Sequence, residues 1–249
     1  MPTAIIIGAS SGLGREIAMT YLRRGYRIGI GARREQLLTP LVEEAPQRVS
    51  AIRIDVTSAD APVQLERLIG MVGGEVDLFV HCAGIGYANP MLEAERDIAT
   101  ADTNCVGFTR ITDYMFNYFA QSGRSGQIAA ITSVAGTCGI GIAASYSASK
   151  RYQQEYLTAL RQLAHQRHLP ITITDLRPGF VDTPLLDADT KYPMIMNPER
   201  AGALIVKAID HRRSSRVIDW RWALLVAAWR CVPSFIWRRM RLGLSARHN

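Results

Sequence analysis

The sequence TAIIIGASSGLGREIAMTYL, residues 3–22, predicts a buried strand, a glycine-rich turn and a helix in direct succession. Its first five residues are apolar or β-branched, which is typical of a buried parallel strand. Glycines in such a turn let the backbone approach a pyrophosphate, and the helix start offers N–H donors and partial positive charge. A plain tight turn is the alternative. We expect dinucleotide contacts from Gly8, Ser10, Ser11, Gly12, Leu13 and Gly14.

Strand and helix patterns continue to alternate along the chain. This alternation predicts an α/β fold with a single Rossmann-type, doubly wound parallel sheet and helices on both faces. We expect one domain at residues 1–219 and a helical tail at residues 220–249. Ligands of such sheets bind at the carboxyl ends of the strands. The further strands are expected at residues 27–31, 49–54, 76–81, 127–132, 171–176 and, as an edge strand, 215–218.

Composition narrows the functional classes. The net charge is +7, but the arginines are spread along the chain, so we expect no nucleic-acid partner. The four cysteines show no close pairing, which suits a reducing compartment and argues against a metal site. The N-terminus has no basic segment before its first strand, so we expect no signal peptide and a cytoplasmic protein.

The end of the second strand bears on the choice of cofactor. An acid at this place binds a ribose 2′-hydroxyl, whereas an arginine suits a 2′-phosphate. Arg33 and Arg34 stand here, and no acid precedes them, so we expect NADP(H) rather than NAD(H). The alternative is that Arg33 lies on a solvated helix start.

The third and fourth strands end in further candidate contacts. Asp55 and Val56 follow the third strand, where a carboxylate accepts a hydrogen bond from an adenine amine or else caps the next helix near Ser58. Small residues follow the fourth strand and leave room for a cofactor: Cys82, Ala83 and Gly84.

Tyr146 and Lys150 stand four residues apart at the start of a long helical pattern. That spacing puts both side chains on one face of the helix, one turn apart. The chain has 26 arginines and only three lysines, so a lysine here is informative. We expect the ammonium to lower the pKa of the phenol and to make it a proton donor. A surface cation is the alternative for Lys150.

Together these residues resemble the short-chain dehydrogenase/reductase family in its classical form. The resemblance covers roughly residues 3–210, and its motifs are specific in combination although each is weak alone. They are Gly8-x-x-x-Gly12-x-Gly14, Asp55, Cys82-Ala83-Gly84, Asn104, Ser133, Tyr146-x-x-x-Lys150 and Pro178-Gly179.

The resemblance implies hydride transfer between a nicotinamide and a small-molecule carbonyl or alcohol. Tyr146 is then the general acid or base, Lys150 supports it and binds the nicotinamide ribose, and Ser133 polarises the carbonyl. Asn104 holds a water that links the lysine to solvent; without the resemblance it would be a packing residue or a helix kink. Further contacts to the nicotinamide half are implied for Pro178, Gly179, Val181 and Thr183.

Two positions depart from the family pattern. Cys82 stands where the family has an asparagine that ties strands together. We expect this replacement to affect local stability more than catalysis. Ser11 stands where many NADP-preferring members carry a basic residue, so the cofactor preference depends on Arg33, with Ser10 and Arg34 as helpers.

The last third contains a lid and an unusual tail. Residues 183–198 have an irregular pattern with three prolines, which indicates a mobile lid over an unidentified substrate. The tail at residues 220–249 holds all four tryptophans and six arginines but no acid. We favour packing of the tail on the domain or on a second subunit, around an apolar substrate. Contact with the inner face of an anionic membrane and plain disorder are the alternatives.

The sequence leaves three candidate functions. The first is an NADP(H)-dependent carbonyl reductase or alcohol dehydrogenase, which the family resemblance implies to be a homodimer or homotetramer. The second is a catalytically silent, dinucleotide-binding regulatory protein, against which the intact serine, tyrosine, lysine and asparagine count. The third is a peripheral membrane reductase with lipid substrates, which the tail alone suggests.

Overall fold

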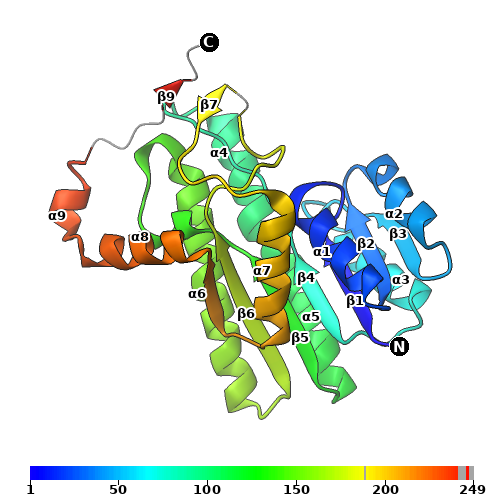
Figure 1. Ribbon diagram of the computed structural model, residues 1–249. Helices are drawn as coiled ribbons and strands as arrows, with labels where there is room; N and C mark the ends of the chain where they lie inside the picture. The colour runs from blue at the N-terminus through cyan, green and yellow to red at the C-terminus, as the bar shows by residue number, and fades with distance from the viewer. Residues whose placement is uncertain (188, 241–244, 247–249) are drawn as a thin grey trace.

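Seven parallel strands form the central sheet, in the order β3-β2-β1-β4-β5-β6-β8. The computed structural model describes residues 1–187, 189–240, 245 and 246 (Figure 1). The strands are β1 (Thr3–Ile7), β2 (Arg27–Ala32), β3 (Val49–Arg53), β4 (Leu78–His81), β5 (Gly126–Ile131), β6 (Ile171–Pro178) and β8 (Ser215–Ile218). The predicted strands and the predicted edge position of residues 215–218 are confirmed.

Helices cover both faces of this sheet, as predicted (Figure 1). They are α1 (Gly12–Arg23), α2 (Thr39–Glu44), α3 (Ala61–Met71), α4 (Ala94–Ala101), α5 (Phe108–Ser122), α6 (Ala144–Gln166), α7 (Pro198–Asp210), α8 (Trp220–Cys231) and α9 (Ser234–Trp237). Shorter helical segments are the 3-10 turns η1 (Glu35–Leu37), η3 (Val134–Thr137) and η4 (Gly141–Ala143) and the π-helical η2 (Asp102–Gly107). In the predicted lid, β7 (Thr190–Lys191) pairs with β9 (Ser245–Ala246).

Alternate residues of β1 face opposite layers of the core, because side chains along a strand point to opposite faces. Ile6 belongs to the cluster under α1, α2 and α7, whereas Ile5 and Ile7 belong to the cluster under α3, α5 and α6. The Ile6 backbone pairs with Ile30 of β2 and Val80 of β4. The sheet is therefore buried on both sides, and its carboxyl edge remains for ligands.

The tail begins directly after β8, and α8 extends sideways from the sheet with α9 at its far end (Figure 1). A third apolar cluster holds α8 to the domain: Trp222 and Val226 pack with Val134, just after the end of β5. In the described part of the chain, no helix has both the length and the apolar character that crossing a bilayer would require.

Candidate active site

The turn between β1 and α1 brings backbone atoms closer than side chains would allow. Gly8 and Gly12 have φ angles of +92° and +53°, which glycine adopts without strain. A Cβ atom on Gly14 would lie 2.2 Å from the Gly8 carbonyl oxygen, and one on Gly8 would lie 2.5 Å from the Ala83 nitrogen. This turn leads into the N-terminus of α1 and fits a dinucleotide pyrophosphate, which N–H donors at a helix start bind. Ser10, Ser11 and Leu13 are half-buried in the same turn.

Two arginines stand beside this turn at the end of β2. The Nη2 atom of Arg34 donates to Ser11 Oγ at 3.4 Å, and both Arg33 and Arg34 are exposed. Ala32, the last residue of β2, pairs in the sheet with Arg53 of β3, whose side chain is also exposed. A nucleotide ribose at this edge would meet cationic side chains.

Asp55 sits in the turn that follows β3. Its Oδ1 atom accepts hydrogen bonds from the Thr57 backbone nitrogen at 3.1 Å and from Thr57 Oγ1 at 2.7 Å. The carboxylate therefore stabilises this turn and does not cap at Ser58. Val56 is buried, and its carbonyl accepts from Arg110 Nη1 of α5 at 2.7 Å, a contact that the sequence analysis did not predict.

Cys82 and Gly84 line the end of β4. The Cys82 backbone nitrogen donates to the Ile7 carbonyl at 2.7 Å, so main-chain atoms tie β4 to β1 without the family's asparagine. Burial raises the pKa of the Cys82 thiol to about 12, so this thiol is neutral at physiological pH. A Cβ atom on Gly84 would lie 3.2 Å from Asn104 Oδ1 and 3.4 Å from Lys150 Nζ.

Asn104 is fully buried in the π-helical turn η2. Its Oδ1 atom accepts from the Ile85 nitrogen at 3.0 Å, and its Nδ2 atom donates to the Ile85 carbonyl at 2.7 Å and to Ser149 Oγ at 3.0 Å. The side chain thus fastens the loop after β4 to α6. A π-helical turn interrupts the α-helical ladder, and such turns are frequent at functional sites.

Ser133 and Tyr146 lie together where β5 and β6 end. Ser133 Oγ accepts from the Ala135 nitrogen at 3.1 Å and donates to the Pro178 carbonyl at 3.4 Å. The Tyr146 ring lies against Gly86, where a Cβ atom would be 2.4 Å from the ring. A hydrogen bond with Ser133 lowers the pKa of Tyr146, but burial raises it by more, so the net shift is upward.

Lys150 is buried beside this pair. Burial lowers its pKa to about 8, although the nearby Asp175 carboxylate opposes that shift. Its Nζ atom donates to the Ile131 carbonyl at 3.2 Å and to Gln153 Oε1 at 3.0 Å, and it lies 5.7 Å from the centre of the Tyr146 ring. The expected lowering of the Tyr146 pKa by Lys150 is wrong for this structure, because burial dominates and the ammonium hydrogen bonds point elsewhere.

Two buried glutamines complete the site, and sequence reasoning missed both. Gln153 accepts from Lys150 and donates through Nε2 to the Asn104 carbonyl at 2.9 Å. Gln154 donates through Nε2 to the Ser133 carbonyl at 2.7 Å. Both glutamines follow Lys150 on the same face of the helix, at spacings of three and four residues. This spacing could have identified them as neighbours of the lysine.

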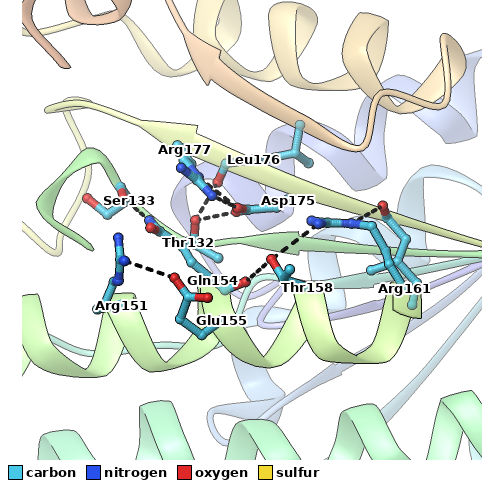
Figure 2. A network of polar contacts seen from close by, with 11 residues as sticks. Thr132, Ser133, Arg151, Gln154, Glu155, Thr158, Arg161, Asp175, Leu176 and Arg177 are labelled. Carbon is cyan, nitrogen blue, oxygen red and sulfur yellow. Dashed lines mark hydrogen bonds and ion pairs between the residues drawn. The ribbon is translucent and has the colours of Figure 1, made fainter. Parts of the chain in front are cut away.

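A buried carboxylate network lies behind Ser133 (Figure 2). Asp175 of β6 is fully buried, and its Oδ1 atom accepts from Thr132 Oγ1 at 2.6 Å. Its Oδ2 atom pairs with Arg177, at 2.7 Å from Nε and 2.6 Å from Nη2. Thr132 precedes Ser133 and Arg177 precedes Pro178, so one carboxylate fixes both strand ends. Sequence reasoning did not identify it.

The segment after β6 connects the site with the turn after β1 and with the tail. Thr183 touches the glycine turn, since a Cβ atom on Gly12 would lie 3.1 Å from its methyl group. Val181 is buried and pairs with Met196 across the predicted lid. Gly179 is covered by the Trp222 indole, 2.1 Å from where a Cβ atom would be.

The sequence-predicted residues therefore gather along one edge of the sheet, and they fit a nicotinamide dinucleotide. The family model described as short chain dehydrogenase matches residues 2–192. An uncharacterised oxidoreductase of Myxococcus xanthus is 33% identical over 231 residues, which are 90% of this chain and 89% of the relative. One of Mycobacterium tuberculosis is 30% identical over 245 residues, 94% and 95% of the two chains.

Solved structures give the same assignment. A variant of actinorhodin polyketide ketoreductase with NADPH is 30% identical, with a TM-score of 0.66 over 74% of this chain and 72% of that one. A short-chain type dehydrogenase/reductase from Mycobacterium marinum shares the fold, with a TM-score of 0.78 at 23% identity over 89% and 95% of the two chains. On this evidence the chain belongs to the short-chain dehydrogenase/reductase family, whose enzymes interconvert alcohols and carbonyl compounds with a nicotinamide dinucleotide.

Proposed function

We propose that this protein is an NADP(H)-dependent oxidoreductase of small carbonyl compounds or secondary alcohols, with Tyr146 as general acid and base. The observation that carries the proposal is the meeting of Ser133, Tyr146 and Lys150 at the loop after β4, the same segment that packs against Gly8 of the glycine turn. The nicotinamide, when bound, supplies or accepts the hydride; the remaining chemistry belongs to the chain.

In the direction of reduction, Tyr146 gives its phenolic proton to the carbonyl oxygen. Its raised pKa keeps the phenol protonated at neutral pH, which favours its role as a donor. Ser133 donates a second hydrogen bond to the same oxygen and stabilises the charge that develops there. Lys150, with a pKa of about 8, is largely protonated at neutral pH and stabilises the phenolate that the proton transfer leaves.

The preference for NADP(H) depends on the cationic edge at the end of β2. Arg34 is held against Ser11, and Arg33 is exposed next to it, so both can meet a ribose 2′-phosphate. The actinorhodin ketoreductase variant that resembles this chain was solved with NADPH, which agrees with the preference.

We further propose that the chain divides into a domain at residues 1–219 and a tail at residues 220–249. We also propose a homodimer or homotetramer whose subunits meet at the outer face of α5 and α6. Val106 and Tyr152 are exposed on that face, and they line a hollow of ≈ 490 Å³ together with Cys105, Thr109 and Arg110. An exposed apolar hollow on two long helices suits a subunit contact.

A panel of aldehydes and ketones, followed at the NADPH absorbance with NADH in parallel, tests the function. The proposal expects turnover with at least one carbonyl class and faster turnover with NADPH. Tight NADPH binding without turnover of any carbonyl, or of any alcohol with NADP⁺, would support the silent regulatory protein instead.

A further inference from the structure

The helix α8 is apolar on both of its faces, and only one face is used inside the molecule. Trp222 and Val226 are buried against the domain. On the opposite side, Trp220, Leu224, Ala227 and Cys231 follow one another at spacings of four, three and four residues, and all four are exposed. That spacing forms a continuous stripe along a helix. Trp220 and Leu224 expose 66% and 63% of their surface.

The orientation of this stripe is fixed by the contacts of the inward face. The Trp222 and Trp229 rings meet edge to face at 6.4 Å, and Trp229 and Trp237 do so at 5.7 Å. Trp237 Nε1 donates to the Gly139 carbonyl at 2.7 Å, which ties α9 back to the domain. Asp219 caps α8 by accepting from the Arg221 nitrogen at 2.9 Å. A tail packed in this way presents its apolar stripe outward.

Cations flank the stripe. Arg221 and Arg230 lie on opposite sides of the stripe, roughly a quarter turn around the helix from it. Arg221 is paired with Asp219 at 2.7 Å, so the charge available to a ligand on this surface comes from the other arginines. Arg230, Arg238 and Arg239 form no ion pair among the described residues. Residues 220–249 contain no acid that could pair with them. Beyond α8, exposed apolar side chains continue at Phe235, Ile236 and Met240.

We propose that α8 and α9 dock on an anionic lipid surface, with the apolar stripe inserted among the lipids and the arginines at the headgroups. Apolar side chains with flanking arginines are the composition of helices that lie in a membrane interface. A second copy of this chain is a poorer occupant, because a twofold contact along the stripe would bring Arg230, Arg238 and Arg239 of both tails together, and residues 220–249 supply no acid to pair with them. The proposal does not depend on the chemistry of Tyr146.

Vesicle sedimentation of the full-length protein tests the proposal. We expect the wild type to pellet with phosphatidylglycerol vesicles, weakly with phosphatidylcholine alone, and several-fold less when salt rises from about 0.1 M to 1 M. The double variant Trp220→Ser with Leu224→Ser should lose at least about tenfold in partitioning. Its control, Val63→Ser with Met71→Ser, removes two side chains of α3 that are 55% and 54% exposed, and should bind like the wild type.

A charge series separates insertion from self-association. Arg230→Gln with Arg239→Gln should weaken binding to phosphatidylglycerol severalfold, whereas Arg53→Gln with Arg67→Gln should not. Equal binding by the α8 variant and its α3 control, or no sedimentation of the wild type with any vesicle, would overturn the proposal. The proposal would also be overturned if the wild type formed an oligomer that does not bind vesicles and if the α8 variant were monomeric. A second copy of the chain would then occupy the stripe.

Discussion

Lys150 and Gln153 are joined by a hydrogen bond of 3.0 Å, and the same carboxamide donates to the Asn104 carbonyl at 2.9 Å. The glutamine thus joins the lysine directly to the main chain of the π-helical turn at Asn104. A carboxamide holds both partners in fixed places, and all three residues are buried. Gln153 is therefore a positioning residue for the ammonium ion.

The first prediction concerns this link. Gln153→Ala removes an acceptor from a buried ammonium, so kcat should fall on the order of tenfold and the Lys150 pKa should drop below about 8. Gln153→Glu should raise that pKa, because a carboxylate favours the ammonium form. The measurement is kcat against pH: the alkaline limb should move down in one variant and up in the other. Exposed Gln162→Ala on the same helix is the control, and identical limbs in all of these proteins would contradict the assignment.

The second prediction concerns the cofactor. Arg33→Ala with Arg34→Ala should weaken NADPH binding by roughly ten- to a hundredfold and leave NADH binding nearly unchanged, since only the 2′-phosphate loses its partners. Fluorescence titration of both nucleotides measures this, with Arg67→Ala on exposed α3 as the matched control. Equal losses for both nucleotides, or a wild type that binds NADH as tightly as NADPH, would reject the preference.

The third prediction concerns acid stability. His81 is buried in a T-shaped contact with Phe108 at 4.9 Å between ring centres, and burial, with a smaller effect of the Lys150 charge, lowers its pKa to about 3. The unfolded chain binds this proton below about pH 6.5, and the folded protein does not, so stability is complete above that pH and is lost as pH falls toward 3.

Urea unfolding at pH 7.5 and pH 5 measures this effect. Protonation of His81 in the unfolded chain should lower the free energy of unfolding of the wild type by about 2 kcal/mol when the pH falls from 7.5 to 5. His81→Leu should remove that part of the decline, whereas exposed His165→Leu should keep it. Parallel declines in the wild type and in His81→Leu would mean that the buried imidazole is not responsible.

The fourth prediction concerns the contact between the tail and the site. Trp222→Ala should lower the free energy of unfolding by about 3 kcal/mol or more, because it empties the space against Gly179 and Phe180. Trp220→Ala removes the same residue type from the exposed side of the same helix and should change stability by less than about 0.5 kcal/mol. Similar losses in both variants, measured by urea unfolding, would show that the inward packing of α8 is wrong.

The hydrophobic periodicity and the glycine-rich turns between segments were sufficient to predict the strands and the sheet, because a regular alternation of strands and helices is compatible with few topologies. The Tyr146 and Lys150 pair was accessible from its spacing. Gln153 and Asp175 were not, because a polar residue in a helix or strand pattern usually faces water, and only the neighbouring elements make it buried. The same reason explains the wrong pKa direction for Tyr146: burial depends on Gly86 and on chain segments distant in sequence.

The sequence patterns also failed to predict two short helices, α2 of six residues and α4 of eight. A segment of that length shows too little of a 3.6-residue period to be told from a loop. The tail packs on the domain through Trp222, Leu225, Val226 and Trp229, which join one cluster, as one of the two favoured interpretations of the tail expected. Its outward face is as apolar as its inward face, and the pattern alone cannot rank them.

The most direct test of the central claim is the turnover of Tyr146→Phe. Removing one hydroxyl leaves the ring against Gly86 and the glycine turn intact, so NADPH should bind within about twofold of the wild type. Turnover of the best carbonyl substrate should fall by at least about a thousandfold, because the proton donor is gone. The matched control Tyr152→Phe, on the outer side of the same helix, should keep near-normal turnover. Near-normal turnover by Tyr146→Phe would contradict the account.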